Sequence, residues 1–98
     1  MDRMFEGATS FNGDIGSWDV SSVTDMNQMF WEAEEFNQDI SSWDVTSVTN
    51  MMFMFQLAAA FNQNLSGWCV SLITSAPTRF DSGASSWVLA RPVWGTCP

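Results

Sequence analysis

The chain has 98 residues, of which 46% are hydrophobic and 14% aromatic, a composition too apolar for an intrinsically disordered segment. Eleven acidic residues stand against three arginines, with no lysine or histidine, so the formal net charge is −8. This balance excludes nucleic acid and anionic membrane surfaces as favoured partners, because both need a basic surface.

The sequence repeats with a period of 25 residues, and the stretch Met26–Asn50 is its clearest copy. Three aromatic rows carry the period: Phe5, Phe30, Phe55 and Phe80; Phe11, Phe36 and Phe61; Trp18, Trp43 and Trp68. A fixed period of this length is typical of repeat proteins, in which each unit stacks on the next. We therefore expect units at 1–25, 26–50 and 51–75, and a degenerate repeat with a C-terminal cap at 76–98.

The first residues, MDRMFEG, have neither the basic nor the apolar region of a signal peptide. No apolar run approaches the length of a membrane span, so we expect no direct membrane insertion. Met4 and Phe5 already stand in mid-repeat register, and we therefore expect further repeats upstream.

Each unit combines two hydrophobic spacings. From Val23 to Ala33, apolar residues recur at intervals of three and four, which predicts a helix there and over Val48–Ala58. Trp43 and Val45 lie two apart, which predicts one face of a short strand. The strands expected to pair side by side are Trp18–Val20, Trp43–Val45 and Trp68–Val70. The predicted fold class is an α/β repeat, a short solenoid of about three and a half units of helix, turn and parallel strand.

Asn12, Asn37 and Asn62 follow the phenylalanine of each turn. An Asn side chain there can satisfy backbone groups of the adjacent unit, so we expect a structural ladder in preference to a ligand site.

Two cysteines, Cys69 and Cys97, lie where the repeat pattern decays. If they pair, the disulfide stabilises the fold by about 3.5 kcal/mol in the chain-entropy model and ties the C-terminal cap to the array. Such a bond persists in an oxidising compartment, which indicates an extracellular or cell-surface protein. The alternative is two buried free thiols. Two cysteines without histidine make a poor zinc site.

The motif V-T-x-M-x-x-M-F-x-x-A-x-x-F-N recurs in the units that follow Asp19 and Asp44. It resembles the short repeats of the BspA-like leucine-rich-repeat surface proteins, over roughly Met4 to Thr74. Ile40, Trp43 and Val45 stand where a leucine-rich repeat has L-x-x-L-x-L, and the Cys-bounded tail resembles the C-terminal ends of some members. The resemblance implies a leucine-rich-repeat-like solenoid in a secreted or surface-anchored adhesive protein. No binding residue of the family carries over, because the matching positions are core positions.

The exposed positions of the expected strands are the candidate binding face. A parallel stack would set them in rows about 4.8 Å apart. The face comprises Ser17, Asp19, Ser42, Asp44 and Gly67. Hydroxyls beside carboxylates make a polar acidic surface that a basic protein segment or a sugar can approach.

Calcium is a less favoured reading of the acidic rows, with Asp14 and Asp39 as weak candidate ligands. Calcium takes six to eight oxygens, and neighbouring carboxylates supply too few, so we expect no metal and no cofactor.

We expect no enzyme, because the chain has no histidine base, no phosphate-binding loop and no activated nucleophile. The sequence instead favours an extracellular or cell-surface module that binds protein or glycan in adhesion. The alternative is a structural spacer within a larger surface protein.

Overall fold

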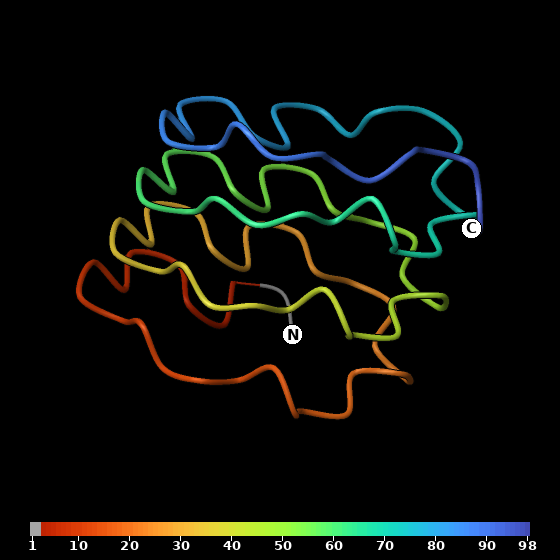
Figure 1. Ribbon diagram of the computed structural model, residues 1–98, viewed down its shortest axis with the longest axis horizontal. Helices are drawn as coiled ribbons and strands as arrows, with labels where there is room; N and C mark the ends of the chain where they lie inside the picture. The colour runs from red at the N-terminus through yellow and green to blue at the C-terminus, as the bar shows by residue number, and fades with distance from the viewer. Residues whose placement is uncertain (1–2) are drawn as a thin grey trace.

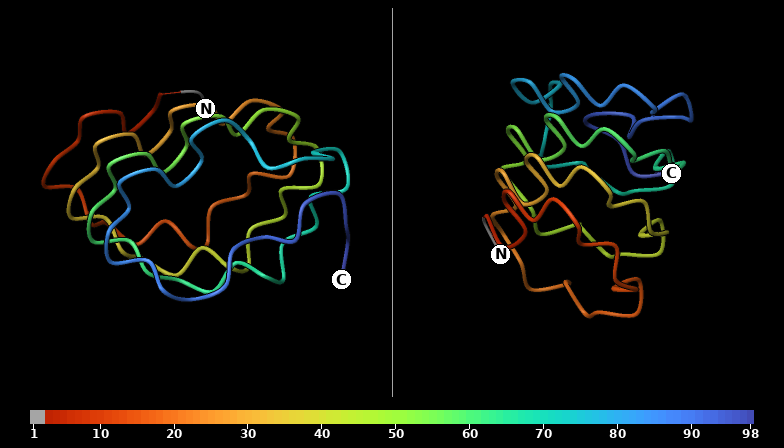
Figure 2. Two further views of the ribbon diagram at one scale, coloured as in Figure 1. Left: turned by 90° about the horizontal axis from the view of Figure 1, so that it is seen from above. Right: turned by 90° about the vertical axis from the view of Figure 1, so that its left-hand side faces the viewer.

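The computed structural model describes residues 3–98, which wind through four coils stacked in one direction (Figure 1). We name them coil 1 (residues 3–25), coil 2 (26–50), coil 3 (51–75) and coil 4 (76–98). Viewed from above, the coils overlie one another (Figure 2). Backbone hydrogen bonds join neighbouring coils at residues 24 apart, such as the Phe5 amide with the Met29 carbonyl at 2.9 Å.

Residues 3–98 form no helix and no extended strand, so the predicted α/β solenoid of helix and strand units is wrong. The one regular pairing in this part of the chain is an isolated parallel bridge between Asp25 and Asn50. The expected strands Trp18–Val20, Trp43–Val45 and Trp68–Val70 are irregular segments. Leucine-rich-repeat architecture, which the resemblance implied, is likewise not what the chain adopts.

Successive turns replace the helices predicted over Val23–Ala33 and Val48–Ala58. The Met29 amide donates to the Met26 carbonyl, and the Ala33 amide to the Phe30 carbonyl, each three residues back. Gln28 (φ 56°) and Glu32 (φ 59°) adopt left-handed backbone conformations within this stretch. Such a residue interrupts a right-handed helix, and here the turns on either side of it still bury the residues spaced by three and four.

Apolar side chains from equivalent positions form one continuous core. Phe30 stacks between Phe5 at 5.6 Å and Phe55 at 5.3 Å, measured between ring centroids. A second column runs parallel, with Phe36 at 5.8 Å from Phe61. Within residues 3–98, no polar or charged residue is buried. The core therefore depends on apolar burial and offset ring stacking.

Coil 4 is out of phase with the others by one residue. The amides of Phe53 and Phe55 donate to the carbonyls of Thr78 and Phe80, 25 residues ahead, where the earlier coils use 24. The left-handed residue Arg79 (φ 49°) accordingly corresponds to Phe53, 26 residues earlier. Phe80 therefore lies in the row of Met54, and its expected alignment with Phe55 is shifted by one.

The C-terminal segment closes the stack. Phe80 and Trp87 meet Phe55 edge to face, at interplanar angles of 79° and 75°. Cys69 and Cys97 form a disulfide that joins coil 3 to the end of the chain. No helix within residues 3–98 has the length and apolar character needed to cross a membrane.

Replacing Trp43 by Ala should lower the free energy of unfolding by about 3 to 5 kcal/mol, because it empties the middle of the core. Trp43 is 4% exposed and its indole nitrogen donates to the Ile15 carbonyl at 3.0 Å. The matched control is Trp18→Ala, at the equivalent position of coil 1, where the side chain is 43% exposed. Urea unfolding followed by tryptophan fluorescence should show a much smaller loss for the control, and equal losses would contradict the stacked core.

Candidate functional site

Segments 11–20, 36–45 and 61–70 run side by side along one face of the stack (Figures 1 and 2). All the predicted face residues are exposed on it: Ser17, Asp19, Ser42, Asp44 and Gly67. The Ser42 hydroxyl donates to the Gly16 carbonyl at 3.3 Å, which ties this row across coils 1 and 2. We call this surface the carboxylate face.

Each aspartate of the carboxylate face is fixed by a turn. Asp19 Oδ1 accepts hydrogen bonds from the Ser21 amide at 3.0 Å and the Ser21 hydroxyl at 2.6 Å. Asp44 Oδ1 accepts equivalent bonds from the amide and hydroxyl of Thr46. Aspartate commonly accepts from the backbone two residues ahead, so these turns follow from the local sequence. They hold one carboxylate oxygen in a defined position and leave the side chain exposed.

Asparagine forms the same turn elsewhere in the chain. Asp39 Oδ1 accepts from Ser41, and in the next coil Asn64 Oδ1 accepts from Ser66 in the same way. Asp14, the coil 1 equivalent, accepts from the Gly16 amide at 3.2 Å. Because an amide oxygen serves as well as a carboxylate oxygen, the turn does not require the negative charge.

The turn hydrogen bonds also set the ionisation of these groups. The Ser21 hydroxyl and amide hold the pKa of Asp19 below its ordinary value. Thr46 lowers the pKa of Asp44 likewise, while the charge of Asp19 acts in the opposite direction. That opposition places the two carboxylates within electrostatic reach of each other. Both are ionised at neutral pH.

The candidate calcium ligands do not come together as a metal site. Asp14 and Asp39 each cap their own turn, and residues 3–98 contain no group of three or more His, Cys, Asp or Glu side chains placed to hold a metal ion.

The asparagine ladder residues connect successive coils. Asn12 Oδ1 accepts from the Asn37 amide at 2.9 Å, and Asn37 Oδ1 accepts from the Asn62 amide at 2.8 Å. Gln38 Nε2 also donates to Asn12, and Gln63 Nε2 donates to Asn37. Sequence reasoning missed the two glutamines, although they share the 25-residue period.

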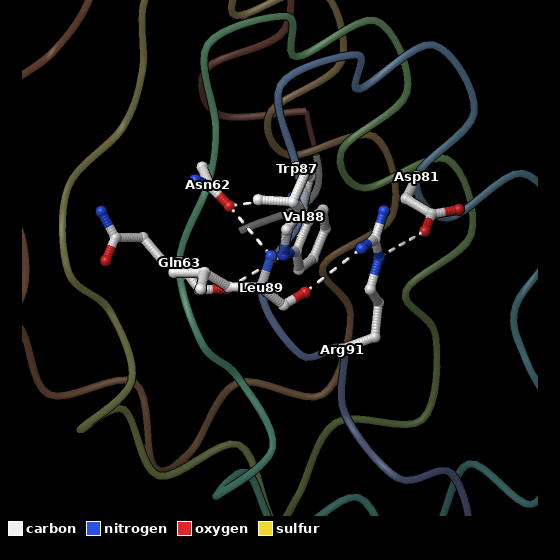
Figure 3. A network of polar contacts seen from close by, with 7 residues as sticks. All are labelled: Asn62, Gln63, Asp81, Trp87, Val88, Leu89 and Arg91. Carbon is white, nitrogen blue, oxygen red and sulfur yellow. Dashed lines mark hydrogen bonds and ion pairs between the residues drawn. The ribbon is translucent and has the colours of Figure 1, made fainter.

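The ladder ends in a polar network at the C-terminal cap (Figure 3). Asn62 Oδ1 accepts from the amides of Val88 and Leu89 at 2.9 and 3.0 Å. Arg91 pairs with Asp81 at 2.9 Å and lies over the ring of Trp87 at 4.6 Å. Sequence reasoning did not identify this pair, whose partners lie on opposite sides of coil 4.

These features define a repetitive protein of stacked, turn-rich coils with an acidic face and a disulfide-closed end. Residues 1–88 match the family model described as "Mycoplasma protein of unknown function, DUF285", and the chain belongs to this family. No curated protein and no solved structure matches the chain.

Acid should destabilise the fold through the turn aspartates. The pKa values of Asp19, Asp25, Asp39 and Asp44 are lowered in the folded state, so they stabilise it fully above the unfolded pKa of about 3.9. That contribution is lost as the pH falls through the lower folded values. Urea midpoints measured from pH 6 to pH 2.5 should therefore fall more for the parent than for the variant with all four aspartates changed to Asn.

The fourfold Asn variant retains an oxygen acceptor in every turn, as Asn50 and Asn64 do in the parent. The difference between the two pH profiles therefore isolates the four carboxyl groups. Parallel profiles would contradict their stabilising role.

Proposed function

We propose that the chain is a non-enzymatic module of an extracellular or cell-surface protein, binding a protein or glycan ligand through its carboxylate face. The observation that carries the proposal is the row of Asp19 and Asp44, two exposed carboxylates fixed at equivalent positions of adjacent coils. Fixed acceptors lose less conformational entropy on binding than free side chains do.

The polar character of this face suits ligands rich in hydrogen-bond donors. Ser17 and Ser42 add hydroxyl groups beside the carboxylates, and Gly67 leaves the third coil without a side chain in that row. Sugar hydroxyls and basic side chains can both donate to such a surface. Each contact is weak because the face is open to solvent, so binding relies on several contacts at once.

The disulfide supports the extracellular setting. The Cys69–Cys97 bond closes the end of the stack, and such bonds are maintained in oxidising compartments. An adhesive role without catalysis agrees with the near-identical surroundings of Asp19 and Asp44, each paired with one hydroxyl and one amide. Acid and base catalysis by two carboxylates needs environments that separate their pKa values.

The oxidised chain should retain a ligand from a panel of extracellular-matrix proteins and a glycan array, with and without calcium. Asp19→Asn with Asp44→Asn should weaken that binding at least tenfold, because it removes both charges while keeping both turns. Surface plasmon resonance measures the affinities.

Glu34→Gln with Glu35→Gln is the matched control, since it removes the same charge from exposed residues outside the carboxylate face. Equal weakening by both pairs would indicate a general charge effect and contradict the assignment of the face. A chain that binds nothing in either panel would favour the structural spacer.

A further inference from the structure

Coils 2 and 3 carry opposite chemistry at equivalent outward positions. In coil 2 these positions hold polar and acidic residues: Asn27, Gln28, Glu32, Glu34 and Glu35. In coil 3 they hold the residues that we call the apolar stripe: Met52, Phe53, Leu57, Ala59 and Ala60. Every one of the five positions exchanges a polar side chain for an apolar one.

The fold does not require these apolar residues. The backbone at Phe53 (φ 59°) and Leu57 (φ 60°) repeats that of Gln28 (φ 56°) and Glu32 (φ 59°), so the same conformation accepts polar side chains. Met52 is 41% and Leu57 42% exposed. Large exposed apolar side chains grouped in this way mark interaction surfaces.

The apolar stripe lies away from the carboxylate face. Residues 51–57 run along the side of the stack opposite to residues 61–70 (Figure 2). A ligand on one face therefore leaves the other accessible.

An acidic row borders the stripe directly. The Glu32 amide donates to the Gln56 carbonyl at 2.9 Å, and the Ala60 amide donates to the Glu34 carbonyl at 3.1 Å. These bonds hold the two coils in contact along the row, with the side chains of Glu34 and Glu35 exposed. The stripe thus has apolar contacts and negative charge side by side.

A cavity of about 300 Å³ opens at the Met52 end of the stripe. It lies where the one-residue shift separates coil 4 from coil 3, and its apolar lining includes Met51, Ile73 and Pro77. This volume is at the lower end of ligand sites in proteins, which suits a single apolar side chain as an anchor.

We infer that the apolar stripe and its acidic border bind a basic amphipathic segment of a partner protein. Apolar side chains of that segment cover Met52, Phe53 and Leu57, and one enters the cavity. Its lysine or arginine residues face Glu32, Glu34 and Glu35. A second copy of this chain is the poorer occupant, because each copy carries a net charge of −8, and an anionic membrane is disfavoured for the same reason.

The test uses the oxidised chain and three synthetic 12-residue peptides: alternating Lys and Leu, alternating Glu and Leu, and alternating Lys and Ser. Isothermal titration calorimetry should show binding of the Lys–Leu peptide at least tenfold tighter than of the other two. Met52→Asn with Leu57→Gln should weaken Lys–Leu binding at least tenfold without changing the net charge. Phe53→Gln, which reproduces coil 2, provides a second variant should the first pair fail to fold.

Glu32→Gln, Glu34→Gln and Glu35→Gln together should weaken the same binding at low salt, with a smaller difference at 0.5 M salt, where screening is strong. Asp19→Asn with Asp44→Asn should leave it unchanged, so failure of the carboxylate-face proposal is distinguishable from failure of this one. Equal binding of all three peptides, or full binding by the folded stripe variant, would overturn the inference. So would a parent dimer in sedimentation analysis that the stripe variant converts to monomer, since the occupant would then be a second copy.

Discussion

Ring stacking from coil to coil is the constraint on which the rest of the structure depends. Phe36 lies between Phe11 at 5.7 Å and Phe61 at 5.8 Å, and the Phe30 column runs beside it. Rings can stack at these separations only if each coil returns the chain to the same place. The coil length, the backbone hydrogen bonds and the polar rows on both faces all follow from that return. Where coil 4 breaks phase, the columns end in edge-to-face contacts with Trp87.

The period predicted which residues are buried, but not the backbone that buries them. A spacing of three and four residues fits a helix and also fits successive turns joined by left-handed residues. Gln28 and Glu32 carry no sign of that conformation, since both are ordinary helix formers. Their row does contain a signal: Gly7 (φ 68°) and Gly83 (φ 78°) align with Glu32 and Leu57 in the outer coils. Glycine at two of four equivalent positions indicates a left-handed residue throughout the row.

The candidate site was similarly predictable in part. The period located Asp19 and Asp44 at equivalent positions, but their turn partners required the local geometry, because no strand forms there. Asn64 in the row of Asp14 and Asp39 was the available clue that the side-chain oxygen has a structural task. The cap pair of Asp81 and Arg91 depends on the phase shift in coil 4, which a strict 25-residue alignment conceals.

The disulfide also determines how the chain would transmit a mechanical load. A pull applied at the C-terminus passes from Cys97 through the sulfur atoms to Cys69, and so bypasses residues 70–96. Those residues form most of coil 4, including the cap that closes the aromatic columns. Tension therefore falls on coils 1 to 3, while the closing coil stays slack and keeps the exposed end of the core covered. For a protein held at a surface, the end that would be first to peel is the one that carries no force.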